Sequence, residues 1–137
     1  MLTINGKEYK VTSKEIFLGN FNNNGIKGYN LNIQLSFINT DNHKKGYINL
    51  DVGFEEEKNI QLFLNKTYEG LPFQEKDNLN IFFEVYDTFD FYDTEISSNI
   101  LINVGKEEDN QVKTKIKLFD NLIKIEFSDY LNIIEKL

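Results

Sequence analysis

Polar and apolar residues alternate strictly along several stretches of this chain. Over residues 30–37 every second residue is apolar, and the same period recurs over residues 47–54. Because successive side chains of a β-strand point to opposite faces, this period predicts strands that bury one face and leave the other in water. The segment between the two stretches is rich in Asn, Asp and Gly, which favour turns. An antiparallel hairpin is therefore predicted.

The clearest alternation lies near the C-terminus, where three lysines separate four inward-facing residues. Asp120 and Asn121 follow it, and both residue types tolerate the positive φ of a two-residue turn. Residues 122–127 then resume the alternation, which predicts a second hairpin. The inward residues are Val112, Thr114, Ile116 and Leu118, and the lysines are Lys113, Lys115 and Lys117. A third hairpin is predicted at the N-terminus, around Asn5 and Gly6.

The final segment changes its period. Four apolar residues recur at helical spacing, Ser128 is suited to a helix N-cap and Asp129 to the first turn. A short helix is therefore predicted over residues 128–137. The four apolar residues are Tyr130, Ile133, Ile134 and Leu137.

Further strands are predicted over residues 15–21, 79–87 and 98–104, whereas residues 57–66 fit either a short helix or an irregular strand. Many short strands with one polar face indicate a mainly β fold, expected to be an antiparallel β-sandwich or open barrel of about eight to nine strands with a short C-terminal helix. Because no linker, repeat or low-complexity segment interrupts the chain, residues 1–137 are expected to form one domain.

Net charge is concentrated in one segment. The chain has a formal net charge of -7, and residues 69–95, with eight acids and one lysine, account for all of it. Such a segment attracts basic surfaces and repels phosphate backbones. Nucleic-acid binding is therefore not expected, and the absence of Arg, which makes bidentate contacts to phosphate and guanine, supports this. The acids are Glu69, Glu75, Asp77, Glu84, Asp87, Asp90, Asp93 and Glu95.

The composition also bears on compartment. Without Cys the chain has no disulfide, thiolate metal site or cysteine nucleophile, which suits a reducing compartment. Residues 1–20 lack the basic and apolar regions of a signal peptide, and no apolar run reaches the roughly 18 residues of a membrane span. A cytoplasmic protein that does not contact membranes is expected.

Acidic and aromatic residues alternate in the stretch FEVYDTFDFYDTEIS, residues 83–97. Aromatic residues offer rigid contact area and carboxylates steer a basic partner, so this stretch is predicted to bind a basic protein. The structural alternative is that Phe89 or Phe91 is buried while the acids only solvate a long turn. The predicted contact residues are Glu84, Tyr86, Asp87, Phe89, Asp90, Phe91, Tyr92, Asp93 and Glu95.

Metal and catalytic sites are not predicted. The acids of residues 87–95 could supply the oxygen ligands of Ca²⁺, but their three-residue spacing and the lack of Gly differ from an EF-hand loop. The only histidine, His43, lies in a hydrophilic turn. We therefore expect a non-enzymatic protein without cofactor. The lysine row at residues 113–117 is interpreted as protection of an edge strand against aggregation.

In general character this small, acidic, Cys-free chain, whose abundant Asn, Lys and Ile reflect A/T-rich bacterial codons, resembles the immunity proteins that neutralise a cognate bacterial toxin. The resemblance lies in composition and not in a motif. It implies that the acidic segment covers the cationic active site of a toxin. The alternatives are a Ca²⁺- or carbohydrate-binding β-sandwich module, a structural or assembly subunit, and a hydrolase with an acid pair.

Overall fold

The computed structural model describes residues 1–23, 26–54, 64–70, 79–86, 91–92, 100–119 and 124–136. These residues form one sheet of ten strands in the spatial order β5-β8-β9-β10-β1-β2-β3-β4-β6-β7. In chain order the strands are β1 (Leu2–Ile4), β2 (Lys7–Asn23), β3 (Ile26–Ile38), β4 (Lys45–Phe54), β5 (Lys66–Gly70), β6 (Leu79–Tyr86), β7 (Phe91–Tyr92), β8 (Ile100–Glu108), β9 (Gln111–Phe119) and β10 (Lys124–Lys136). All neighbours pair antiparallel, apart from an additional parallel pairing of β10 with β2.

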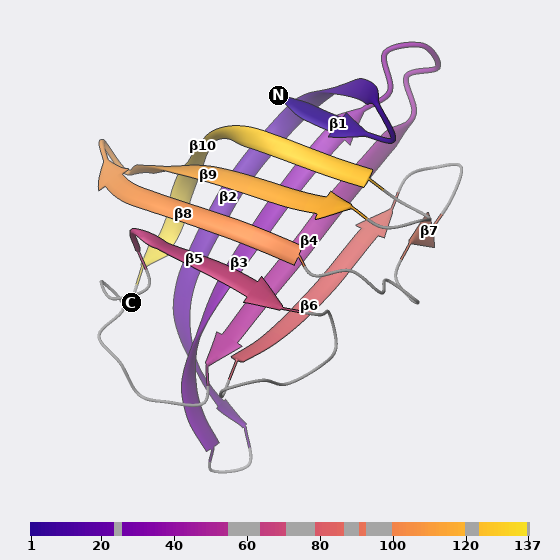
Figure 1. The fold of residues 1–137 in the computed structure, drawn as a ribbon. Coiled ribbons are helices and arrows are strands. Elements are labelled where there is room, and N and C mark those ends of the chain that lie inside the picture. Colours follow the sequence, from indigo (N-terminus) through magenta and orange to yellow (C-terminus); the bar gives the residue numbers. More distant parts are fainter. Residues whose placement is uncertain are drawn as a thin grey trace.

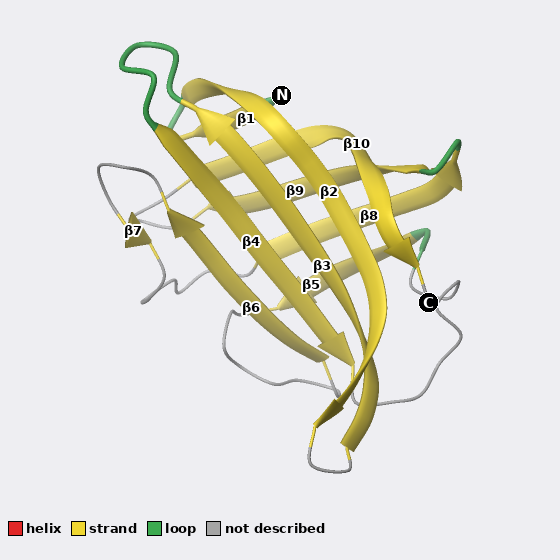
Figure 2. Cartoon of the chain, turned by 180° about the vertical axis from the view of Figure 1, so that it is seen from behind, coloured by secondary structure: helices red, strands yellow, loops and turns green. Residues whose placement is uncertain are grey.

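The sheet curls into a half-barrel (Figures 1 and 2). In Figure 1, strands β5, β8, β9 and the first part of β10 form one layer, which crosses a second layer made of β2, β3, β4 and β6. Strands β5 and β7 end the sheet and do not pair with each other, so among the described strands the barrel stays open. The predicted mainly β, antiparallel fold is confirmed for the described strands. The described strands form one curled sheet and not the two separate sheets of a sandwich.

The core lies between the two layers. Inward-facing residues of the long strands are buried and their outward neighbours are polar, as the alternation predicts; on β9 the pattern is strict from Val112 to Phe119. The core cluster includes Ile102 of β8 and Ile116 of β9 from one layer and Ile33 of β3 and Leu50 of β4 from the other, so both layers contribute to one core. The largest fully buried side chains come from β1, β2, β3 and β4. These side chains are Phe37, Leu2, Ile16, Leu18, Leu31, Ile33, Leu35, Ile48 and Leu50.

The predicted hairpins are present. Asn5 and Gly6 turn β1 into β2 with φ values of 52° and 79°, so a glycine relieves strain at the second position. Strands β3 and β4 pair in antiparallel register, as do β9 and β10. The turn residues 120–123 lie outside the described residues. Residues 15–21 belong to β2, which continues through a bulge between Val11 and Ser13.

The predicted C-terminal helix is wrong. Residues 124–136 form strand β10, and the described residues contain no helix. The inward positions are Phe127, Asp129, Leu131 and Ile133; because one of them is an acid, the apolar alternation is hidden in the sequence. The helical spacing arose because Ile134 is apolar although it points outward and is exposed. Of the undecided segment 57–66, only Leu64, Asn65 and the first residue of β5 are described.

The position of β9 overturns the interpretation of its lysines. Strand β9 pairs with β8 on one side and with β10 on the other. It is therefore an interior strand, and protection of a sheet edge does not explain Lys113, Lys115 and Lys117.

Candidate protein-binding site

The acidic-aromatic stretch begins in the layer opposite the lysines. Glu84 and Tyr86 lie on β6, and Phe91 and Tyr92 make up β7. The antiparallel register places Tyr86 opposite Phe91, so the two described parts of the stretch pair with each other at one end of the sheet order. The other predicted contact residues, Asp87, Phe89, Asp90, Asp93 and Glu95, lie outside the described residues. Whether Phe89 or Phe91 is buried therefore stays a prediction.

The strand next to this edge is β4, whose outer face is polar. Its register with β6 places Asn49 opposite Glu84 and Tyr47 opposite Tyr86. On β3, the Asn32 side chain donates a hydrogen bond of 2.9 Å to Asn49 Oδ1. This bond joins two polar side chains across the outer face, so part of the hydrogen-bonding capacity of both amides is used within the sheet and not for a sugar.

The acidic residues are not confined to one strand. Glu69 lies on β5, at the opposite end of the sheet order from β7. Strand β6, which carries Glu84, lies next to β7 at the far end of that order. The segment that carries the net charge of -7 therefore begins on β5 at one end of the sheet order and includes β6 and β7 at the other.

An ion pair that the sequence did not predict joins β2 to β10. Lys14 Nζ lies 2.7 Å from Asp129 Oδ2. In the strand registers Lys14 is opposite the buried Leu35, and Asp129 is opposite the buried Thr114, so both charges occupy inward positions. The signal in the sequence is an interruption of the apolar alternation in both strands. Two charged residues in inward positions are expected to pair with each other.

The Asp129 carboxyl has several partners. The Tyr130 amide donates a hydrogen bond of 2.7 Å to Asp129 Oδ1. Partial burial acts to raise the pKa of Asp129, but the hydrogen bonds from Lys14 and the Tyr130 amide, together with the charges of Lys14 and the N-terminus, lower the pKa below its ordinary value. On β10 the pair lies between the residues that pair with β1, which end at Phe127, and those that pair with β2 from Asn132 onward. The ion pair therefore joins β2 and β10 just before their backbone pairing begins.

The described residues offer no catalytic constellation. His43 is exposed in the β3–β4 turn, and its backbone amide donates to the carbonyl of Asn39. Tyr68 is buried, and its burial raises the pKa of the phenol, which keeps it neutral. Within the part of the chain that the structure describes, no three His, Cys, Asp or Glu side chains group as metal ligands. None of the described residues forms a helix long and apolar enough to span a membrane.

The fold defines the chain as an all-β protein built on one open, curled sheet. Comparison with known proteins finds no matching family, no similar protein among the curated ones and no similar solved structure.

Proposed function

We propose that this chain is a non-enzymatic protein-binding domain that acts as a bacterial immunity protein, covering a basic surface of a cognate toxin with its acidic-aromatic stretch, residues 83–97. The observation that carries the proposal is the charge distribution. The whole formal net charge of -7 falls in residues 69–95, and the described part of residues 83–97 lies at the last pair of strands in the sheet. The cytoplasm is the proposed compartment.

Charge and position would act together in this function. Opposite charge raises the rate at which two proteins meet, and aromatic residues then supply contact area within the interface. At the end of a sheet a partner can approach both the strand edge and its face. The neighbouring strand β4 supplies a firm support, because β3 and β6 pair with it along its length.

The test begins with the gene beside the one for this chain, which the proposal expects to encode a toxin, and uses the product of that gene. Co-expression of the chain should restore the growth of cells that make the toxin. Replacing Asp90 and Asp93 by Ala should lower the association rate constant by roughly tenfold at low salt and flatten its dependence on ionic strength. A matched control replaces Glu8 and Glu108 by Ala. Both are exposed, and they lie on β2 and β8, which do not pair with β6 or β7.

Two results would overturn the proposal. One is an association rate that is the same for the Asp90/Asp93 variant and the wild-type chain. The other is equal loss in the Glu8/Glu108 control, which would show that total charge matters and that the position of the acids does not.

A further inference from the structure

The lysine row of β9 requires an explanation other than edge protection. Lys113, Lys115 and Lys117 are exposed on the outer face of an interior strand whose inward residues are buried. Like charges on alternate residues of one strand repel each other, and pairing of β9 with both neighbours is already complete. Lys117 lies opposite Glu126 and Lys113 lies over the Tyr130 ring, so these two lysines have partners within the sheet. Lys115, by contrast, lies opposite Ser128 and Asn103.

Exposed apolar residues gather around this row. Five large hydrophobic residues are exposed among the residues whose side chains the structure describes. Three of them lie beside the lysines: Phe119 on β9, Tyr130 on β10 and Met1 just before β1. Lys113 Nζ lies 5.9 Å from the centre of the Tyr130 ring, and Lys124 Nζ lies 5.3 Å from that of Phe119. Aromatic rings and ammonium groups thus alternate across the surface, a combination found where proteins bind charged partners.

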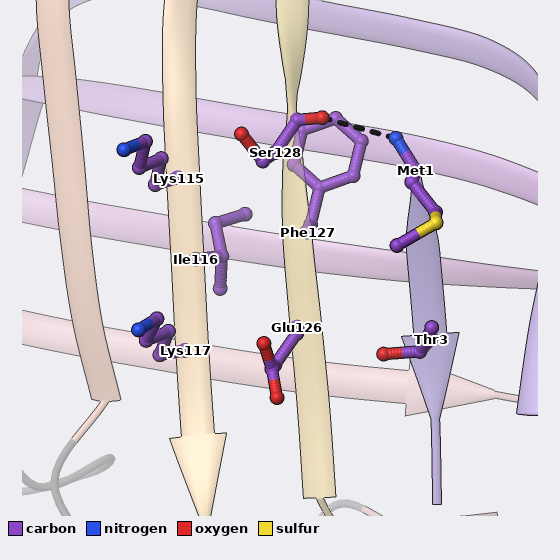
Figure 3. A pocket seen from close by; sticks show the side chains of 8 residues that line it. All are labelled: Met1, Thr3, Lys115, Ile116, Lys117, Glu126, Phe127 and Ser128. Carbon is purple, nitrogen blue, oxygen red and sulfur yellow. Dashed lines mark hydrogen bonds between the residues drawn. The ribbon is translucent and has the colours of Figure 1, made fainter. Parts of the chain in front are cut away.

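A shallow hollow of about 230 Å³ lies in the middle of this surface (Figure 3). Two ammonium groups, two hydroxyl groups, the carboxylate of Glu126 and the thioether of Met1 surround it, whereas Ile116 and Phe127, which also line it, are 1% and 2% exposed and occupy inward positions. The Met1 amino group is held at its border, where it donates a hydrogen bond of 3.0 Å to the Ser128 carbonyl. The remaining lining residues are Thr3, Lys115, Lys117, Glu126 and Ser128.

We propose that this basic face, formed by Lys113, Lys115, Lys117, Phe119, Lys124 and Tyr130, binds an acidic peptide segment of a protein partner. The hollow receives one carboxylate side chain of the segment between Lys115 and Lys117. The apolar neighbours of that carboxylate pack against Phe119 and Tyr130. None of these residues belongs to residues 83–97, so the inference stands or fails independently of the function proposed above.

The surroundings of the lysines favour an acidic peptide over other anions. Glu126 lies on β10 directly opposite Lys117, so it would repel a continuous array of phosphates such as a nucleic-acid strand or an anionic bilayer. The chain as a whole, with a net charge of -7, repels both at long range. A peptide can place its carboxylates beside the lysines and leave an uncharged residue beside Glu126. The chemistry therefore points to separate carboxylates and not to a polyanion.

The experiment titrates the full chain with three probes. The first is a peptide of about 12 residues that repeats Glu-Glu-Phe, the second a thymidine oligonucleotide of about 20 residues, and the third vesicles of phosphatidylcholine with phosphatidylserine. The peptide is expected to bind most tightly. The double variant Lys115→Glu with Lys117→Glu should weaken peptide binding by roughly tenfold or more. The control, Lys45→Glu with Lys66→Glu, makes the same charge change at exposed lysines of β4 and β5 and should bind within about twofold of the wild type.

Each contrary result overturns the inference. Tighter binding of the oligonucleotide or the vesicles would assign the face to a polyanion. Equal weakening in the control would show an effect of net charge alone, and absence of peptide binding to the wild-type chain would show that the face is not a peptide site. Because the substituted lysines are exposed, both variants are expected to fold, and a thermal melt of each confirms that they do.

Discussion

The acidic and basic surfaces of this chain differ in how the sheet supports them. The lysines project from β9, which is paired on both sides. The inward side chains of the same strand, among them Ile116 and Leu118, are buried. The acidic-aromatic stretch begins on β6 and continues into β7, which pairs on one side only. The position of a charged side chain on an interior strand depends on the packing of the inward residues of that strand. At the end of the sheet, the position of a charged side chain depends on fewer neighbours. The basic face is therefore expected to be sensitive to core substitutions, and the acidic stretch to tolerate change.

The largest expected effect comes from the packing beneath the basic face. Ile116→Ala removes a side chain that is 1% exposed, and it should lower the free energy of unfolding by about 3 kcal/mol because it leaves a cavity. Lys117→Ala, on the outward side of the same strand, should change the free energy of unfolding by less than about 0.5 kcal/mol. Urea unfolding of both variants measures the difference. Similar losses of unfolding free energy for the two variants would contradict the placement of Ile116 inward and Lys117 outward on β9.

The ion pair between β2 and β10 should have the next largest effect. Lys14→Met leaves Asp129 in an inward position without its partner, and it should lower the free energy of unfolding by about 1–2 kcal/mol, between the values for exposed and buried pairs. Adding Asp129→Leu should recover part of this loss, so the two substitutions should not be additive. A double-mutant cycle in urea measures the coupling. Additive losses would show that the pair does not act as a unit.

The same pair predicts how stability depends on pH. The pKa of Asp129 is lowered in the folded chain, so its contribution is present above the unfolded value of about 3.9 and is lost as pH falls through the folded pKa. The difference in unfolding free energy between the wild type and Asp129→Asn should therefore be constant from about pH 7 to pH 5 and shrink below about pH 4. A difference that grows on acidification would contradict the ion pair.

The smallest effect on stability is expected in the acidic stretch. Replacing Asp90 and Asp93 by Ala removes two like charges from a segment that carries the whole net charge, so the free energy of unfolding should stay within about 0.5 kcal/mol of the wild type or rise slightly. Thermal and urea unfolding measure it. A loss of several kcal/mol would mean that these acids serve the fold, as the ion pair does, and not a partner.

The sequence predicts the fold well where inward positions are apolar. The hairpins of β1 with β2, β3 with β4 and β9 with β10 follow from alternation and turn residues alone. Prediction fails in the second half of β10, because Asp129 occupies an inward position and Ile134 an outward one. The inward Asp129 is explained by Lys14, its partner far away in the sequence. The interrupted alternation marks each residue, but nothing in the local sequence identifies the two as partners.

The candidate surfaces show a similar limit. The acidic segment could be found by counting charges, and the register adds that β6 and β7, which lie within it, pair with each other. The lysine row was also visible in the sequence, but its meaning depends on whether β9 is an edge or an interior strand. That property is set by the order of strands in the sheet, which alternation along one strand does not encode.

The most direct test of the central claim, that the acidic-aromatic stretch binds a basic partner, is the association rate with the toxin that the proposal expects the neighbouring gene to encode, measured at a series of salt concentrations. For the wild type and for the Glu8→Ala, Glu108→Ala control, the rate should fall steeply and in parallel as salt rises, because screening removes the steering. For the Asp90→Ala, Asp93→Ala variant the rate should be slower at low salt and should fall less steeply as salt rises, because six of the eight acids of residues 69–95 remain. Identical slopes for all three proteins would contradict the claim.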